Sequence, residues 1–247
     1  MNNRTTLQLV AALLLAAPAG HTAEPSERSV QAVQFAKSSS SASIQGSIRG
    51  YHYVDYQLRA GAGQTLKVGL KAGHIANYFN ILPPDSIDAA MYNASMNENR
   101  FEGLLPADGV YTVRVYLMRA AARRNESSAY TLSVSITGKP LAPLSPKVDA
   151  LIPGTPFHAR TTARCEPAYS KTRECEASVI RRGHDGTATV ELRWDRTSTR
   201  RILFIQGKPV ASDTMQAMTY TRNDRAYFVR FGGDERFEIP EALVFGG

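Results

Sequence analysis

The sequence predicts an all-β protein: an antiparallel β-sandwich followed by a second, small antiparallel β domain with one disulfide. Three observations predict this fold class. Apolar and polar residues alternate in short stretches from residue 42 onward, and Gly, Pro, Asn and Asp recur between those stretches. No segment of residues 42–138 keeps a long 3.6-residue period. Short period-two stretches separated by turn residues are typical of sandwiches and barrels.

The strands expected in the first part of the chain follow from this alternation in order. A first strand is expected within 30–37, and the clear alternation starts at Ala42. The strands then fall within the ranges 42–50, 52–60, 65–73, 77–84, 89–95, 100–105, 110–118 and 130–138. Residues 24–138 are therefore predicted to form the sandwich.

A change of composition marks the predicted boundary between two domains. The stretch 138–154, GKPLAPLSPKVDALIPG, contains four prolines and two glycines, which pair poorly in a sheet. We interpret 139–153 as a semi-rigid linker and 154–247 as the small β domain. Its strands are expected within 155–183, 187–195, 199–210, 217–224 and 226–245, joined by Asp-Gly, Gly-Lys and Asn-Asp turns.

The first residues have the pattern of a secretory signal peptide. Arg4 precedes the apolar run 7–17, which is too short for a permanent membrane span, and Ala17-Pro18-Ala19 fits a cleavage site. We predict a signal peptide over 1–23 and a periplasmic protein without membrane insertion.

Cys165 and Cys175 are the only cysteines of the chain. Because the protein is predicted to be exported, we expect them to form one disulfide, which would stabilise the folded state by roughly 2–3 kcal/mol.

The charge balance favours acidic partners. The formal net charge is +7 and the isoelectric point is about 9.5. The runs RRGHDG and RWDRTSTRR carry much of the positive charge of residues 139–247. They either bind an anionic envelope polymer or form a solvated face of a small domain, and export argues against nucleic acid as the partner.

The connection 116–132, YLMRAAARRNESSAYTL, is longer and more basic than a simple turn between two strands requires. Together with GSIRGYHYVDYQLRAGAGQTLKVGL, YFNILPP and GLLPADGVYTVRVY, it resembles the bacterial inhibitors of goose-type (g-type) lysozyme over about residues 30–138. These inhibitors are periplasmic β-sandwich proteins. The DYQLRAGAGQTLKV element also resembles the pre-peptidase type of sandwich. The C-terminal stretch 233–247 resembles an exported bacterial module of unknown function.

The resemblance implies which residues contact the lysozyme. Arg119 and Arg123 match the R-x-x-x-R motif of the inhibitors, and Arg124 follows directly. A tyrosine of GYHYVDY is also implied, Tyr51 before Tyr53. If AAAR forms a helical turn, Arg119 and Arg123 share a face and could donate to carboxylates together. Without the resemblance, these arginines would be interpreted as a solvated loop protecting a sheet edge.

The sequence predicts neither an enzyme nor a cofactor. The histidines are scattered, without metal-ligand spacing, and no nucleophile elbow or phosphate-binding glycine loop is present. Asp234, Glu235 and Glu238 are interpreted as turn and surface charge, Tyr56 as a core residue, and Asp55 as the partner of a Lys or Arg. The predicted function is inhibition of g-type lysozyme, and the alternative is a glycan- or protein-binding sandwich without inhibitor activity.

Overall fold

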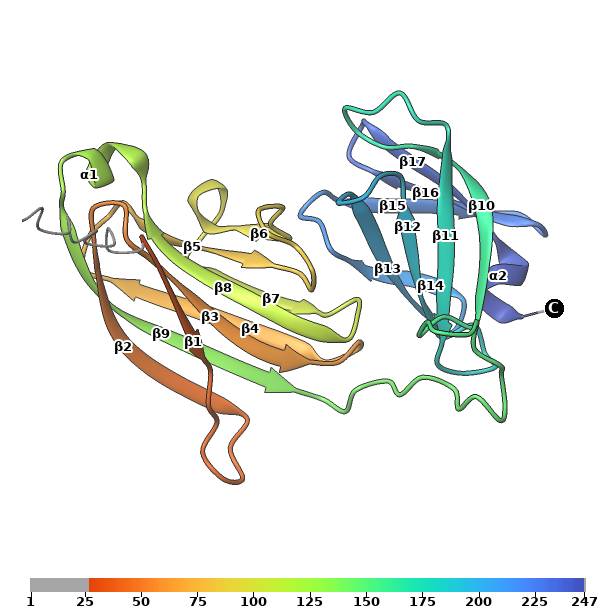
Figure 1. Ribbon diagram of the computed structural model, residues 1–247, viewed down its shortest axis with the longest axis horizontal. Helices are drawn as coiled ribbons and strands as arrows, with labels where there is room; N and C mark the ends of the chain where they lie inside the picture. Colours follow the sequence, from red (N-terminus) through yellow and green to blue (C-terminus); the bar gives the residue numbers. More distant parts are fainter. Residues whose placement is uncertain (1–26, 247) are drawn as a thin grey trace, which may run out of the picture.

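The computed structural model describes residues 27–246, so the predicted signal peptide lies outside the described residues. Strands up to Thr137 form two sheets and strands from Ala159 form a third, as Figure 1 shows. We call residues 28–137 the first half and residues 159–245 the second half. The all-β fold class is confirmed.

The first half is a sandwich of a five-stranded and a four-stranded sheet. The five-stranded sheet has the order β1 (Arg28–Ala32), β3 (Tyr53–Ala60), β8 (Gly109–Leu117), β5 (Asn77–Leu82) and β6 (Tyr92–Asn93). The four-stranded sheet has the order β2 (Ser41–Arg49), β9 (Ser127–Thr137), β4 (Thr65–Ala72) and β7 (Arg100–Leu104). The short 3-10 helix η1 (Ala94–Met96) follows β6. The pairing is antiparallel except between β1 and β3, which are parallel.

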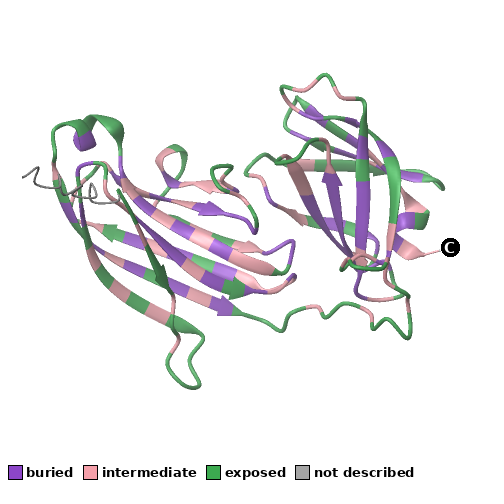
Figure 2. Cartoon of the chain, in the orientation of Figure 1, coloured by how far each residue is buried: buried purple, intermediate pink, exposed green. Residues whose placement is uncertain are grey.

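The core of the first half lies between its two sheets. Alternate residues of the longer strands, such as β4, β8 and β9, point inward, which gives the striped burial pattern in Figure 2. Tyr56 is buried as predicted, and its hydroxyl lies 2.8 Å from that of Tyr130. Asp55, on the opposite face of β3, has no exposed side-chain surface and accepts hydrogen bonds from Arg28 and Arg114. The predicted basic partner of Asp55 is therefore confirmed.

The second half is one curved antiparallel sheet of eight strands with a helix at its end. The chain order is β10 (Ala159–Glu166), β11 (Glu174–Arg181), β12 (Ala188–Arg193), β13 (Thr199–Ile205), β14 (Lys208–Ser212), β15 (Met218–Arg222), β16 (Ala226–Phe231), β17 (Glu235–Pro240) and α2 (Glu241–Phe245). In the sheet, β10 pairs with both β11 and β17, which leaves β14 and β15 at the edges. The Cys165–Cys175 disulfide is present between β10 and β11.

The structure corrects the interpretation of two charged segments in the second half. Glu235 is buried rather than on the surface, and Arg200 donates to its carboxylate at 2.9 Å. Arg200 also donates to Asp213, and Arg201 donates to Glu191. A guanidinium that is removed from water requires such carboxylate partners. The run RWDRTSTRR is therefore neither a solvated face nor an open anion-binding surface at these two arginines.

Buried arginines join the two halves. The Arg182 side chain is 0% exposed and donates to Asp108, the Leu141 carbonyl and Thr189. Thr189 in turn donates to the carbonyl of Pro106. Arg201 donates to the Pro84 carbonyl at 2.6 Å and lies 3.1 Å from Asp85. Apart from the contacts of Arg182 with Thr189 and with Leu141 of the linker, these contacts reach the β5–β6 and β7–β8 connections of the first half, which lie on the side of the second half in Figure 1.

The predicted linker contains no helix or strand, and its backbone bonds to both halves. Leu141 donates to the carbonyl of Ala62, and Leu144 donates to the carbonyl of Arg181. A segment fixed at both ends in this way restricts how far the halves can move apart.

Candidate partner-binding site

Three connections meet at the end of the sandwich that faces away from the second half: residues 50–52, 73–76 and 118–126 (Figure 1). We call this set of connections the tip. Each crosses from one sheet to the other, because β2, β4 and β9 belong to the four-stranded sheet whereas β3, β5 and β8 belong to the five-stranded sheet. The basic connection 118–126 therefore closes the end of the sandwich, which explains why it is longer than a hairpin turn.

Backbone hydrogen bonds hold the three connections together. Gly50 donates to the carbonyl of Glu126, and Met118 donates to the carbonyl of Ala76. Gly50 has a φ of +57°, and a Cβ there would lie 2.9 Å from the Asn125 side-chain oxygen, so glycine suits both the backbone and the space. Arg49 donates to the Asn125 carbonyl. The tip is thus a hydrogen-bonded unit and not three separate loops.

The helix α1 (Arg119–Arg123) positions two of the predicted arginines. The alanines Ala121 and Ala122 are buried and belong to the core cluster that the helix covers at this end of the sandwich. Arg119 and Arg123 are exposed, and their spacing of four residues places them on neighbouring turns of one helix face. Neither makes an ion pair or side-chain hydrogen bond among residues 27–246. Their donors are therefore open to a partner.

Arg124, in contrast, is bound within the tip. Its Nε lies 2.5 Å from Glu126 Oε1, and the His74 Nε2 lies 3.0 Å from Glu126 Oε2. The Ala76 amide donates to His74 Nδ1, so the proton of a neutral His74 ring resides on Nε2, the nitrogen nearer to Glu126. The Arg124 guanidinium lowers the pKa of Glu126, and His74 adds to that effect.

The two predicted tyrosines have different surroundings. Tyr51 lies in the 50–52 connection, which a backbone hydrogen bond from Gly50 joins to the 118–126 connection, and it is 51% exposed. Tyr53 is half-buried on the outer face of the five-stranded sheet, where the Arg114 guanidinium stacks 4.7 Å from its ring centroid. The structure therefore brings Tyr51, Arg119, Arg123 and Arg124 together, whereas Tyr53 is occupied by an intramolecular contact.

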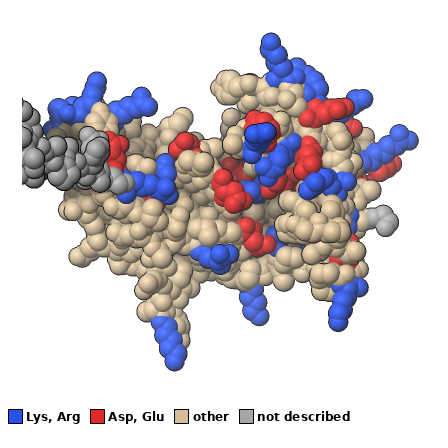
Figure 3. All heavy atoms as spheres, viewed as in Figure 1, with Lys and Arg blue, Asp and Glu red and all other residues tan. Residues whose placement is uncertain are grey.

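One exposed residue of the tip was not predicted from the sequence. Ile75 lies in the 73–76 connection and is 90% exposed. The only sign of it in the sequence is the isoleucine of GHIA, at the point where the strand alternation stops. Because this residue lies in a turn, its side chain is not directed into the core. Positive side chains gather at this end of the molecule in Figure 3, and Glu126 is the only carboxylate within the three connections.

Among residues 27–246, no group of three or more side chains is arranged to bind a metal ion. The helices in this range are also too short to span a membrane.

The comparison with family models finds no match. The first half is 33% identical over 105 residues to the inhibitor of g-type lysozyme of Escherichia coli (strain K12), which is 42% of this chain and 78% of that protein. The chain belongs to the family of g-type lysozyme inhibitors.

Solved structures of such inhibitors are similar to the same share of the chain. The periplasmic inhibitor of g-type lysozyme from Aeromonas hydrophila is 38% identical, covering 44% of this chain and 97% of that one, with a TM-score of 0.42. A mutant of the Escherichia coli periplasmic inhibitor is 30% identical, covering 44% and 98%, with a TM-score of 0.35. These relatives account for less than half of the chain.

Proposed function

We propose that the protein inhibits a g-type lysozyme by inserting its tip into the active-site cleft of the enzyme. The family relationship of the first half supports the choice of partner. A glycoside hydrolase carries carboxyl groups in its cleft, and two guanidinium groups on one face of a short helix have the planar donors that carboxylates accept. The proposal includes no catalysis by this chain and no cofactor.

The observation that carries the proposal is that Arg119 and Arg123 are exposed and lack an intramolecular partner among the described residues, unlike Arg124. An arginine whose donors are free in the unbound protein can bind a carboxylate of the partner without first breaking an ion pair. The buried Ala121 and Ala122 fix the helix that carries both arginines, which reduces the entropy lost on binding.

Tyr51 and Ile75 complete the proposed contact surface. Tyrosine combines an apolar ring with a polar hydroxyl, and tyrosine and arginine are enriched in binding hot spots. Ile75 adds exposed apolar surface to the same tip. Arg124 is proposed to stabilise the tip through its ion pair with Glu126 and not to make a primary contact with the enzyme. Tyr53 is proposed to contribute least, because Arg114 already covers its ring.

The decisive experiment measures inhibition of a purified g-type lysozyme by the mature chain. The double variant Arg119→Ala/Arg123→Ala is expected to weaken inhibition by a factor of about thirty or more, the equivalent of about 2 kcal/mol or more for hot-spot arginines. Arg59→Ala is the matched control, because Arg59 is an exposed arginine on β3 that makes no ion pair or side-chain hydrogen bond within residues 27–246. Unchanged potency of the double variant would contradict the proposed contact surface.

We further propose that the mature protein acts in the periplasm after removal of residues 1–23. The relatives whose structures are solved are described as periplasmic, and the disulfide requires an oxidising compartment. Mass spectrometry of the protein from a periplasmic extract tests this, since the expected N-terminus lies after Ala19 or Ala23.

A further inference from the structure

The second half holds an exposed tyrosine on a loop that a disulfide closes. Cys165 and Cys175 join the ends of the β10–β11 connection, with 5.9 Å between their Cα atoms. Tyr169 in this loop is 105% exposed and has a φ of +57°, a left-handed conformation that few non-glycine residues adopt. Because the Tyr169 ring is fully exposed to water, it does not contribute to the packing of the core. The ring is therefore available to a ligand.

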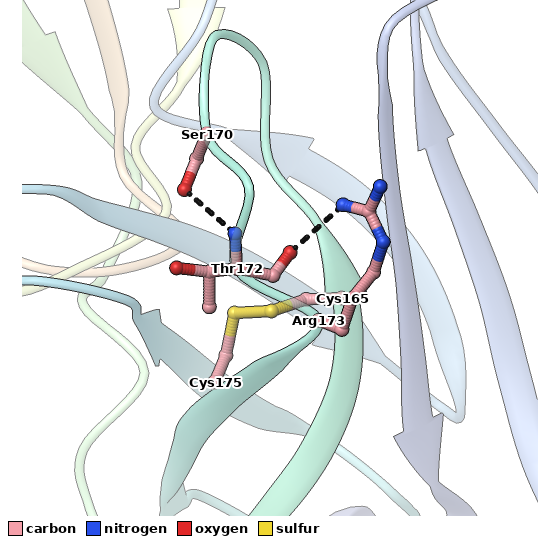
Figure 4. The surroundings of a disulfide bond; sticks show 5 residues. All are labelled: Cys165, Ser170, Thr172, Arg173 and Cys175. Atoms are coloured by element: carbon pink, nitrogen blue, oxygen red, sulfur yellow. Dashed lines mark hydrogen bonds between the residues drawn. A yellow bond between two sulfur atoms is a disulfide. The ribbon is translucent and has the colours of Figure 1, made fainter.

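Hydrogen bonds order this loop. Thr172 donates its amide to Ser170 Oγ at 3.1 Å, and Ser170 donates its own amide to the Pro167 carbonyl. Figure 4 shows the disulfide across the base of the loop, with the Arg173 guanidinium donating to the Thr172 carbonyl. A loop fixed in this manner presents its side chains in one arrangement before any ligand arrives.

A groove begins beside Tyr169. A hollow of about 480 Å³ lies between the loop and the β16–β17 turn, with Arg173, Arg236, Glu166 and Asp234 in its lining. A second hollow of about 400 Å³ shares Arg173, Arg236 and Glu166 and extends over the strands β10, β16 and β17. Because the hollows share these residues, we describe them as one groove, open along the surface of the sheet.

The groove is lined by guanidinium and carboxylate groups in equal number. The second hollow adds Arg164 and Arg230, and also Glu174 and Glu238. Such a lining gives no net attraction for a polyanion. Arg236 Nη1 lies 3.6 Å from Glu166 Oε2, and the guanidinium and carboxylate groups of the lining offer planar donors and acceptors along the groove. Sugar hydroxyl groups both donate and accept hydrogen bonds, and the apolar face of a sugar ring packs on an aromatic ring. The chemistry therefore fits a carbohydrate better than a simple anion.

We propose that this groove binds the glycan strands of the bacterial cell envelope, with Tyr169 as a stacking platform and Arg173 and Arg236 as donors to sugar oxygens. The tip and the groove lie on different halves of the molecule, far apart in Figure 1, so both sites are accessible at once. Attachment to the polymer that a lysozyme attacks raises the effective concentration of an inhibitor near its target.

The test measures co-sedimentation of the full mature chain with purified peptidoglycan sacculi in the absence of any lysozyme. Tyr169→Ala is expected to weaken binding by about tenfold, and Arg173→Ala/Arg236→Ala by a similar factor. Tyr220→Ala is the matched control, because Tyr220 is an exposed tyrosine of the same half outside the groove. Since Tyr169 is entirely exposed, its replacement leaves the thermal unfolding midpoint unchanged.

Two further arms separate glycan recognition from charge attraction. Soluble chitin tetrasaccharide is expected to displace the protein from sacculi, and binding is expected to persist at about 0.5 M salt, where charges more than a few ångströms apart are screened. Sacculi binding that is identical in Tyr169→Ala overturns the proposal, as does binding that high salt abolishes. The assay contains no enzyme, so this failure is distinguishable from a failure of lysozyme inhibition.

Discussion

At the scale of the residue, the arginines of this protein fall into two groups with opposite roles. Arg114, Arg182, Arg200 and Arg201 lie against carboxylates in buried or half-buried places, where they stabilise the fold. Arg119 and Arg123 are exposed without such partners among the described residues. Burying an unpaired guanidinium destabilises the folded state, so the arginines of the first group require their carboxylate partners. The arginines of the second group can instead bind another molecule.

The dependence of the first group predicts the effect of removing one carboxylate. Asp55→Ala leaves Arg114 half-buried without its two hydrogen bonds, and the expected loss is about 2–3 kcal/mol, less than for a fully buried pair because Arg28 remains partly exposed. Urea unfolding measures this loss. Asp88→Ala is the control, since Asp88 is exposed and 3.5 Å from Arg114, and its replacement is expected to change stability little. Equal losses in both variants would contradict the assignment.

At the scale of the element, the tip shows how a connection acquires a fixed shape. The helix α1 is only five residues long and would not persist by itself in water. Its alanines pack on the core, and Glu126 links the 118–126 connection to His74 of the 73–76 connection. The order of the tip therefore comes from contacts between connections that are distant in the sequence.

The ion pair of Glu126 predicts a pH dependence of the stability of the tip. The folded state lowers the pKa of this carboxyl group, so the ion pair stabilises the protein above the ordinary glutamate pKa and this contribution is lost as pH falls through the lowered value. Glu126→Gln is expected to be less stable than the wild type at pH 7. The difference in thermal midpoint is expected to disappear as pH falls below the lowered pKa. A difference that stays constant down to pH 3 would exclude this role.

At the scale of the whole molecule, the two halves form one hydrogen-bonded assembly. The face of β12 and β13 that carries Thr189, Glu191 and Arg201 points away from the core of the second half, yet these side chains are buried. They are covered by the first half and the 138–158 segment. The tip lies at the opposite end of the sandwich, so the second half does not cover it (Figure 1).

This arrangement predicts that the halves unfold together and can be uncoupled. The double variant Arg182→Ala/Arg201→Ala removes the hydrogen bonds to Asp108, Pro84 and Asp85. Each loss is expected to lie below the value of about 3–5 kcal/mol for a fully buried ion pair, because Asp108 and Asp85 are exposed enough to be hydrated. Calorimetry is expected to show one transition for the wild type and two for the variant. Arg225→Ala, on the surface, is expected to retain one transition. A single transition in the double variant would contradict coupling through these arginines.

Much of the fold and part of the site could be predicted from the sequence. Strand alternation placed Tyr56 in the core, and Asp55 was expected to have a basic partner. The disulfide was predicted from two cysteines in a chain with the sequence pattern of a secretory signal. For the proposed site, Arg119, Arg123 and Tyr51 were predicted through the family resemblance. Ile75 was not predicted, because an exposed apolar residue in a turn has no periodic signal.

By itself, the sequence determined the local properties: where strands run, where turns interrupt them, and which connection is basic. These depend on neighbouring residues and on the period of two that a strand imposes. Only the tertiary structure decided that β8 and β9 lie in different sheets, so that the 118–126 connection closes a sandwich. It also decided that Arg201 and Glu235 are buried and that Arg200 is half-buried against Glu235. The physical reason is that a charge is stable inside a protein only beside an opposite charge, and the chain supplies those partners from distant positions.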